Sequence, residues 1–316
     1  MFQTRPLIKG FAAVGTLGLA AELLCRFALG LGSPPLYRAD PLLEYQFHPN
    51  QELRRFGNRI SINAFGMRAG PVTTQPAPGV RRVLIFGDSV LWGGAQIDQA
   101  QIATTLLPTL MPPGAKLEVA PAGTPSWGPA NWLGFSRRYG FLGASDMVLL
   151  ISSHDAEDWP SYQPLAQQPD KPIRRPVLAL QEALIRYGWQ RFAPARQPIE
   201  RADLTDRGRR SLDALATLIR ASRQAGVRPL AVQFWERYEI GDPIGKGQLQ
   251  SGHGAIAAVL KQEAVPTFQA GPAMAACAQR AGLAPSNLFV DTIHPYTLLG
   301  QRCLAEAIAQ ALNHDP

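Results

Sequence analysis

Short apolar runs bounded by polar turns recur along the middle and end of the chain. The clearest is Val83 to Phe86, which lies between two arginines and a Gly-Asp-Ser turn. A short apolar run without alternation is typical of a strand that is buried on both faces of a sheet. On this basis the sequence predicts four strands, at Val83–Phe86, Leu117–Ala120, Met147–Ser152 and Pro229–Phe234.

Helical patterns lie between and after these runs. The longest starts near Asp206 and stops at Gly226, a glycine of the kind that ends helices. Others follow Ser89, cover residues 132–139 and close the chain at residues 298–312. Strands that alternate with helices predict an α/β fold of three layers, α/β/α, in which helices cover both faces of a mostly parallel sheet.

Residues 1–33 form a segment of a different kind. Arg5 and Lys9 precede an uncharged apolar stretch, 10–21, and Glu22 and Arg26 follow four residues apart, so that they can pair on one helix face. This pattern favours a signal-anchor helix of about 20 residues that crosses a membrane once. A cleaved signal peptide and a buried helix of a soluble protein are the alternatives.

Two segments interrupt the strand–helix rhythm. Residues 34–80 contain proline-rich links around an alternating stretch near Ile60 and Ile62, which predicts an extended link or hairpin packed on the main domain, 81–316. Residues from about 160 to 201 are interpreted as an insertion in that domain, which serves either as surface decoration or as a lid.

Composition narrows the classes of partner. The 316 residues carry a net charge of +7, but the arginines are scattered and no basic stripe with interleaved aromatics is present, so no nucleic-acid partner is expected. A basic surface favours anionic partners such as phospholipid head groups or acidic glycans. The cysteines, Cys25, Cys277 and Cys303, show no CxxC spacing, and at most one bridge, Cys277–Cys303, can form in the main domain.

Two motifs carry candidate chemistry. Ser89 stands in "FGDSVLWG", where a parallel strand ends and a helix begins, the edge at which α/β sheets bind ligands. About 200 residues later, "FVDTIHPYT" places Asp291 and His294 three apart before the last helix. A serine nucleophile needs a base, and the base needs an orienting group, so these three residues are candidates for a Ser-His-Asp triad. Leu91 replaces the second glycine of Gly-x-Ser-x-Gly, which excludes the α/β-hydrolase elbow.

Together, "FGDSVLWG" and "DTIHP" resemble the SGNH, or GDSL-type, hydrolase superfamily over about residues 81–312. The resemblance implies a five-stranded, flavodoxin-like sheet, Ser89 as the nucleophile, His294 as the base and Asp291 as its orienting group. It implies no cofactor and no metal. A metal site built on the His154–Asp158 stretch, "HDAED", has no second histidine at ligand spacing.

The same resemblance assigns two donors to an oxyanion hole, and this chain departs from the family pattern at both. The glycine donor after the second strand aligns with Ser126, with Gly123 as the alternative register, and the asparagine after the third strand aligns with His154. A backbone N–H from Ser126 or a ring N–H from His154 can still donate. We expect His154 to act in this way and to make the donor sensitive to pH.

Two further expectations follow. The segment "SINAFGMRAG" resembles an Asn-x-x-Gly-x-Arg segment of membrane-anchored envelope SGNH proteins, which implies that Asn63 to Gly70 packs near the active-site edge. Core packing is the expected place of the nearby tryptophans, with stacking on sugars as the alternative; they are Trp92, Trp127, Trp132 and Trp159.

The leading functional hypothesis is a serine esterase that removes O-acyl groups, chiefly O-acetyl groups, from an envelope or exported polysaccharide. An O-acetyltransferase with the same triad, a lipase, and a non-catalytic glycan-binding or assembly protein on the same scaffold are the alternatives. The expected location is the inner membrane, with the catalytic domain facing the periplasm or the cell exterior.

Overall fold

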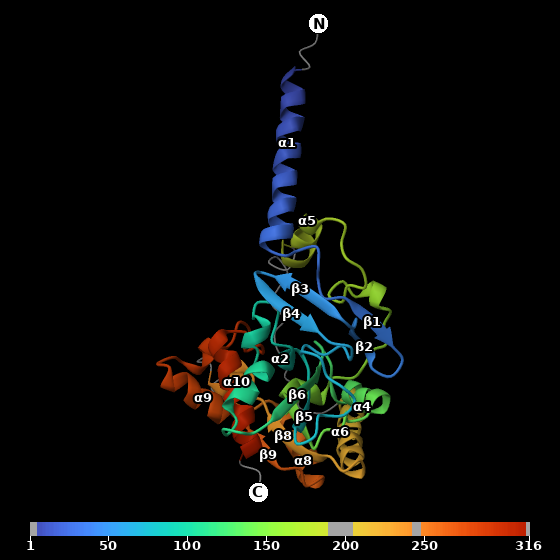
Figure 1. Cartoon of the computed structure of the whole chain (residues 1–316), viewed down its shortest axis with the longest axis vertical. Coiled ribbons are helices and arrows are strands. Elements are labelled where there is room, and N and C mark those ends of the chain that lie inside the picture. Colours follow the sequence, from blue (N-terminus) through green and yellow to red (C-terminus); the bar gives the residue numbers. More distant parts are fainter. Residues whose placement is uncertain (1–4, 189–204, 242–247, 314–316) are drawn as a thin grey trace.

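The computed structural model describes residues 5–188, 205–241 and 248–313, and of residues 5–12 it describes the backbone alone. Its centre is a five-stranded sheet in the order β6-β5-β7-β8-β9, in which every neighbouring pair is parallel (Figure 1). The strands are β5 Arg81–Gly87, β6 Leu117–Gly123, β7 Asp146–Ile151, β8 Arg228–Gln233 and β9 Thr267–Gln269. The predicted α/β fold and its parallel sheet are confirmed.

Side chains that alternate along the strands enter two separate cores. On β5, Leu84 and Phe86 pack toward one face of the sheet, and Val83 and Ile85 pack toward the other. The first face is covered by α4 Pro129–Tyr139, α6 Asp206–Gln224 and α8 Ser251–Gln262. The second is covered by α3 Ala103–Leu106, α9 Ala270–Arg280 and α10 Leu298–Asn313. Both faces are therefore buried, which explains why four of the strands read as continuous apolar runs.

Two antiparallel hairpins precede the sheet, where the sequence predicted one extended link or hairpin. The first pairs β1 Tyr37–Asp40 with β2 Glu44–Phe47, and the second pairs β3 Gln51–Arg55 with β4 Asn58–Ile62. Tyr45, Phe47, Ile60 and Ile62 are buried in the core that also contains Leu84 and Phe86. The hairpins are thus part of the main core.

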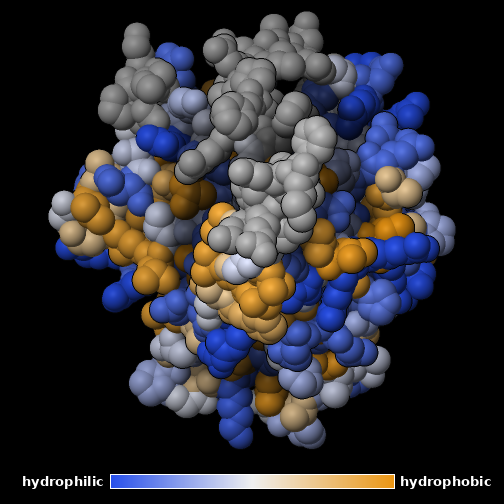
Figure 2. Space-filling model, turned by 90° about the horizontal axis from the view of Figure 1, so that it is seen from above, coloured by the Kyte–Doolittle hydropathy of each residue, from blue (hydrophilic) through white to orange (hydrophobic). Residues whose placement is uncertain are grey.

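Helix α1, Arg5–Leu23, extends away from this body in Figure 1. The predicted pair forms at its base, where Arg26 donates to Glu22, and Glu22 also accepts from the backbone N–H groups of Ala179 and Leu180 in α5, Ala179–Glu182. Apolar side chains are exposed around this end, as Figure 2 shows from above; Leu17, Leu24, Phe27 and Val177 are among them. We expected α1 to cross a membrane, but among the helices of the described residues none is both long enough and apolar enough to do so.

The described part of the predicted insertion lies beside α1 and the hairpins. The carbonyl of Pro172 accepts from Tyr37, and Glu44 accepts from Ser161 and Tyr162. Glu182 pairs with the buried Arg55 of β3. These contacts attach residues 160–188 to the hairpins, and the role of the segment as decoration or as a lid stays a prediction. Residues 189–201 lie outside the described part of the chain.

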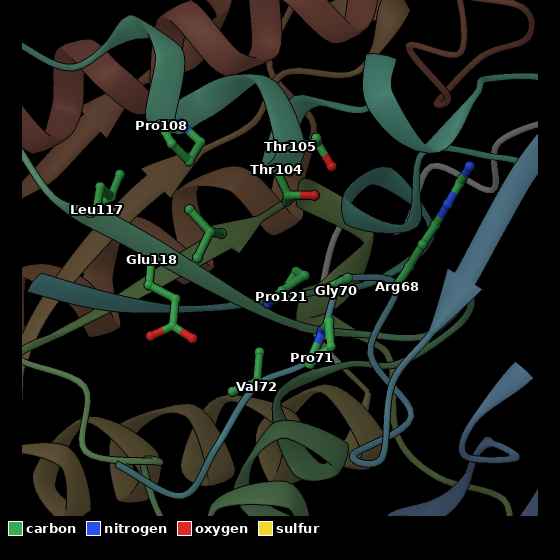
Figure 3. Close-up of a pocket in the computed structure, with 12 residues that line it drawn as sticks. Arg68, Gly70, Pro71, Val72, Thr104, Thr105, Pro108, Leu117, Glu118 and Pro121 are labelled. Carbon is green, nitrogen blue, oxygen red and sulfur yellow. The ribbon is translucent and has the colours of Figure 1, made fainter. Parts of the chain in front are cut away.

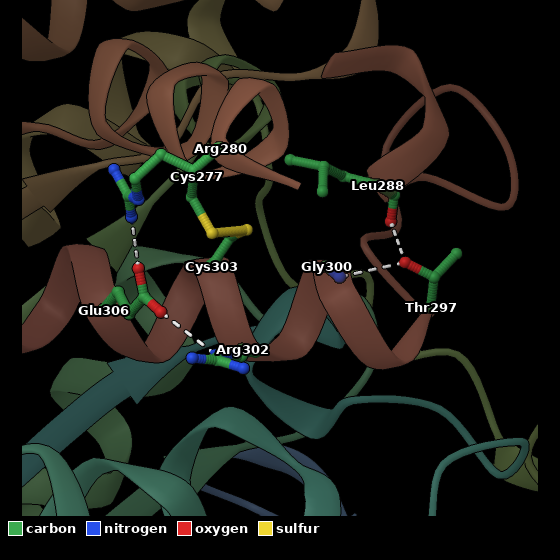
Figure 4. The surroundings of a disulfide bond; sticks show 8 residues. All are labelled: Cys277, Arg280, Leu288, Thr297, Gly300, Arg302, Cys303 and Glu306. Atoms are coloured by element: carbon green, nitrogen blue, oxygen red, sulfur yellow. Dashed lines mark hydrogen bonds and ion pairs between the residues drawn. A yellow bond between two sulfur atoms is a disulfide. The ribbon is translucent and has the colours of Figure 1, made fainter. Parts of the chain in front are cut away.

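Cys277 of α9 and Cys303 of α10 form a disulfide (Figure 4). Arg280 and Arg302 both pair with Glu306 beside it. The bridge ties together two helices on the same face of the sheet, and one of them, α10, follows directly on the loop that carries His294.

Candidate active site

Ser89 opens a short helix, α2 Ser89–Trp92, at the carboxyl end of β5. The carboxylate of Asp88 caps this helix, because its Oδ1 atom accepts from the N–H of Val90 at 2.8 Å. Strand β5 lies between β6 and β7, so loops from both neighbours meet at the same edge. Ser89 therefore stands at the point of the sheet where a ligand can meet side chains from several strand ends.

His294 approaches Ser89 from the loop that directly precedes α10. Its Nε2 atom lies 2.9 Å from Ser89 Oγ, and its Nδ1 atom lies 2.7 Å from Asp291 Oδ2. This is the distance at which a base can take the serine proton while its other nitrogen is held by a carboxylate. The structure thus brings together the three residues that the sequence proposed as a triad.

Local hydrogen bonds fix Asp291 beside His294. Its Oδ1 atom accepts from the backbone N–H groups of Ile293 and His294, at 2.9 and 2.8 Å. Partial burial opposes the charge, but these bonds and the bond to the His294 ring hold the pKa of Asp291 below its ordinary value. The carboxylate remains charged at neutral pH, as an orienting group requires.

Tyr296 supports the same pair, although no role was predicted for it from the sequence. Its ring stacks on the His294 ring with 4.7 Å between centroids, and its hydroxyl donates to the carbonyl of Ser89. Burial raises the pKa of Tyr296 well above 10, so it keeps its proton and remains a donor. An aromatic residue two positions after a candidate histidine base was the available signal.

The two candidate backbone donors follow β6. Gly123 is the last residue of β6 and pairs in register with Gly87, and a Cβ there would clash with the side chain of Leu91. Ser126 has a φ of 62°, in the left-handed region that favours glycine. Tyr45 holds this loop, since its hydroxyl lies 2.9 Å from the carbonyl oxygen of Pro125 and 3.2 Å from that of Ser126. Ser126 thus adopts a backbone conformation that suits the glycine it replaces; its role as a donor stays a prediction.

His154 does not have the geometry that the resemblance implied. Its Nε2 atom lies 2.8 Å from Asp88 Oδ2, and its Nδ1 atom lies 2.9 Å from Glu236 Oε1. Burial opposes a charge here, but the carboxylates of Asp155, Asp88 and Glu236 outweigh it and raise the pKa of His154 well above 6.5. Both ring N–H groups are engaged by carboxylates, so in this arrangement neither is free for an oxyanion.

Asp88, His154 and Asp155 lie close enough together to be considered as metal ligands. Burial raises the pKa of Asp155 well above its ordinary value. Both ring nitrogens of His154 already lie at hydrogen-bond distance from carboxylate oxygens of Asp88 and Glu236, so in this arrangement neither is free to bind a cation. The arrangement fits a hydrogen-bonded cluster better than a metal centre.

The segment 63–70 packs on the loop that follows α2. Arg68 is buried, and its guanidinium donates to the carbonyls of Trp92, Gly94 and Ile97 and lies 4.7 Å from the centre of the Trp92 ring. Asn63 shapes the turn that presents it, because its side chain accepts from Phe65 and Met67. This turn therefore supports the loop after α2, and Tyr45 of the first hairpin supports the loop after β6.

Of the four tryptophans near the motifs, three belong to the core. Trp92, Trp127 and Trp132 are buried, which excludes sugar stacking by these three, while Trp159 is only partly buried. A pocket of about 260 Å³ opens at the outer edge of β6, between α3 and the segment after Arg68 (Figure 3). Ser89, Asp291 and His294 do not line it, so it is separate from the triad.

Several solved structures match this chain distantly, each with a TM-score below 0.5. TesA matches with a TM-score of 0.42 at 17% identity, over 73% of this chain and 98% of that chain. Axe2, an acetylxylan esterase from Geobacillus stearothermophilus, matches with a TM-score of 0.46 at 13% identity, over 74% and 95% of the two chains. A GDSL-like lipase from Bacteroides thetaiotaomicron matches with a TM-score of 0.41 at 12% identity, over 76% and 91%.

At these scores and identities the likeness carries no information on substrate. No protein-family model matches the chain, and no curated protein matches it.

Proposed function

We propose that this chain is a serine esterase that removes O-acyl groups, chiefly O-acetyl groups, from an envelope or exported polysaccharide. The observation that carries the esterase part is the continuous line of hydrogen bonds from Ser89 Oγ through His294 to Asp291, with distances of 2.9 and 2.7 Å. The motifs of the sequence, which resemble those of SGNH hydrolases, support the same chemistry.

The geometry supports a two-step reaction. Ser89 Oγ attacks the ester carbonyl while its proton moves to His294 Nε2, and the same nitrogen then protonates the departing sugar oxygen. An acyl group is left on Ser89. Water attacks it with His294 as the base, which releases the carboxylic acid and restores the serine hydroxyl.

Exposure of the triad supports a large substrate. The Asp291 side chain is 50% exposed and the His294 side chain 25% exposed, so the triad lies at the surface of the molecule. An acetyl group displayed on a polymer can reach such a site without the whole substrate having to enter a cavity.

The chemistry is tested with p-nitrophenyl acetate and the full chain, with Ser89→Ala as the matched control. We expect nitrophenol release by the wild type and the spontaneous background rate with the variant. Release of free acetate from an O-acetylated polysaccharide tests the substrate class. Equal rates for wild type and variant would overturn the triad, and activity on the small ester alone would overturn the polysaccharide assignment.

We further propose that the domain works outside the cytoplasm. The Cys277–Cys303 disulfide supports this location, because such bonds persist in oxidising compartments. Attachment to a membrane through residues 1–33 stays a prediction from the basic start and the apolar stretch. Cleavage of the domain by a protease added to intact spheroplasts tests the location, and retention in the membrane pellet after carbonate washing tests the attachment.

A further inference from the structure

Two acceptors compete for the proton of Ser89. Its hydroxyl lies 2.9 Å from His294 Nε2 and 3.3 Å from Asp88 Oδ2, and one hydroxyl proton can serve only one of them. If Asp88 held this proton, His294 could not accept it as a base. The site therefore needs another hydrogen-bond donor to Asp88 Oδ2, so that the serine hydroxyl donates to His294 instead.

His154 also lies within hydrogen-bond distance of Asp88 Oδ2. Its Nε2 atom lies 2.8 Å from Asp88 Oδ2, closer than the serine hydroxyl, and a charged donor makes the stronger hydrogen bond. The other Asp88 oxygen already accepts the N–H of Val90. With both oxygens engaged, Asp88 caps the helix of the nucleophile and leaves the serine proton to His294.

We infer that His154 is a positioning residue for Ser89. His154 acts on Ser89 through Asp88, and Glu236 holds the His154 ring in place. This inference rests on the proposed esterase function. It replaces the oxyanion role that the resemblance implied for His154, and it assigns a role to Glu236, for which none was predicted from the sequence.

The surroundings of the ring are strongly acidic. Four acidic side chains influence the pKa of His154 or of a carboxyl group beside it: Asp88, Asp155, Asp158 and Glu236. A fifth, Glu239, accepts a hydrogen bond from Ser153, the residue before His154. Glu236 is itself fixed on its second oxygen by Gln250 Nε2 at 2.8 Å. Such surroundings favour a protonated ring, whose two N–H groups can donate to Asp88 and Glu236 at once.

Two substitutions of His154 separate the positioning role from the oxyanion role. A glutamine places an N–H at about the reach of Nε2, toward Asp88, whereas an asparagine places it at about the reach of Nδ1, toward Glu236. Positioning predicts that His154→Gln keeps more activity than His154→Asn, which we expect to lose roughly 10–10²-fold in kcat at similar KM. An oxyanion donor that replaces the usual asparagine predicts the opposite order.

Glu236→Gln adds a readout that a merely structural role would not move. The amide oxygen can still accept from Nδ1, but the loss of a negative charge lowers the pKa of His154. We expect kcat to fall on the alkaline side at a lower pH than in the wild type. Glu263→Gln, which removes a carboxylate from a separate pair with Arg220, is the matched control and should leave the pH profile unchanged.

The closing experiment measures kcat, KM and pH profiles of these variants with p-nitrophenyl acetate, with rates referred to folded enzyme. Nitrogen-15 NMR of the wild-type histidines covers the case of variants that fail to fold, because it reports directly whether the His154 ring carries both protons at pH 8. An inactive wild type would overturn the proposed function and this inference with it. An active wild type with a neutral His154 ring, with Asn above Gln, or with an unshifted Glu236→Gln profile would overturn this inference alone.

Discussion

The Nε2 atom of His294 lies 2.9 Å from Ser89 Oγ, although the two residues are 205 positions apart in the chain. The parallel sheet produces this meeting, since β5 delivers Ser89 to its carboxyl edge and the loop before α10 returns His294 to the same edge. The contacts around the pair then determine how firmly each side chain is held, and several of them can be tested separately.

Tyr296 is the first of these supports. Replacing it with phenylalanine keeps the ring on His294 but leaves the Ser89 carbonyl without its hydroxyl donor. We expect Tyr296→Phe to lower the free energy of unfolding by about 1 kcal/mol and kcat by roughly 3–10-fold. Tyr162→Phe, at an exposed tyrosine, is the control. Identical kinetics for the Tyr296 variant and wild type would show that the hydrogen bond has no part in holding the serine.

Arg68 is the second support. Arg68→Met leaves the carbonyls of Trp92, Gly94 and Ile97 without this donor, and we expect urea unfolding to show a loss of roughly 3 kcal/mol or more. Arg59→Met, which breaks an exposed pair with Asp98, should cost no more than about 1 kcal/mol. A similar cost for both variants would contradict the role given to Arg68.

The disulfide stabilises the helix that follows His294. Cysteines 26 positions apart close a loop for which the chain-entropy treatment gives on the order of 3 kcal/mol. The double variant Cys277→Ala, Cys303→Ala should therefore melt at a lower temperature than the oxidised wild type and should not respond to a reductant. Its turnover per folded molecule at low temperature should be unchanged. A melting temperature equal to that of the oxidised wild type would contradict this account.

Asp158 gives a pH dependence of stability. Burial raises its pKa to about 6 in the folded protein, above its ordinary value of 3.8. The folded state then holds the proton more tightly than the unfolded state, so stability is lost as pH rises from about 4 to about 6. Asp158→Asn removes this loss and should stabilise the protein by on the order of 1–3 kcal/mol at pH 7, but not at pH 3.5.

Unfolding curves across this pH range measure the effect. Asp170→Asn, at a side chain that is 61% exposed, is the control and should run parallel to the wild type. A gain for Asp158→Asn that is equal at both pH values would rule out titration of Asp158 as its source.

The parts of this account that sequence could predict are local. The strand ending at Gly87 and the Asp291–His294 turn are short contiguous patterns, and each is read without knowledge of the rest of the fold. Strand β9 escaped prediction because it has three residues, none of them buried. The first hairpin, β1 with β2, escaped prediction because its short strands are held in place by packing against the main core.

His154 shows the other limit. Its position in the chain marked it as a candidate, but its role depends on Glu236, which is 82 residues away and follows β8. No local pattern links the two residues. Only the neighbouring positions of β7 and β8 in the sheet bring them together.

The central claim is that Ser89 is the nucleophile, and covalent labelling tests it most directly. A fluorophosphonate probe reacts with a serine that a neighbouring base activates, and mass spectrometry of the digested protein identifies the labelled residue. We predict a single label on the peptide that contains Ser89, its loss in Ser89→Ala, and labelling of His294→Ala slower by a factor of roughly 10³ or more. Labelling of Ser89→Ala as fast as that of the wild type would contradict the account.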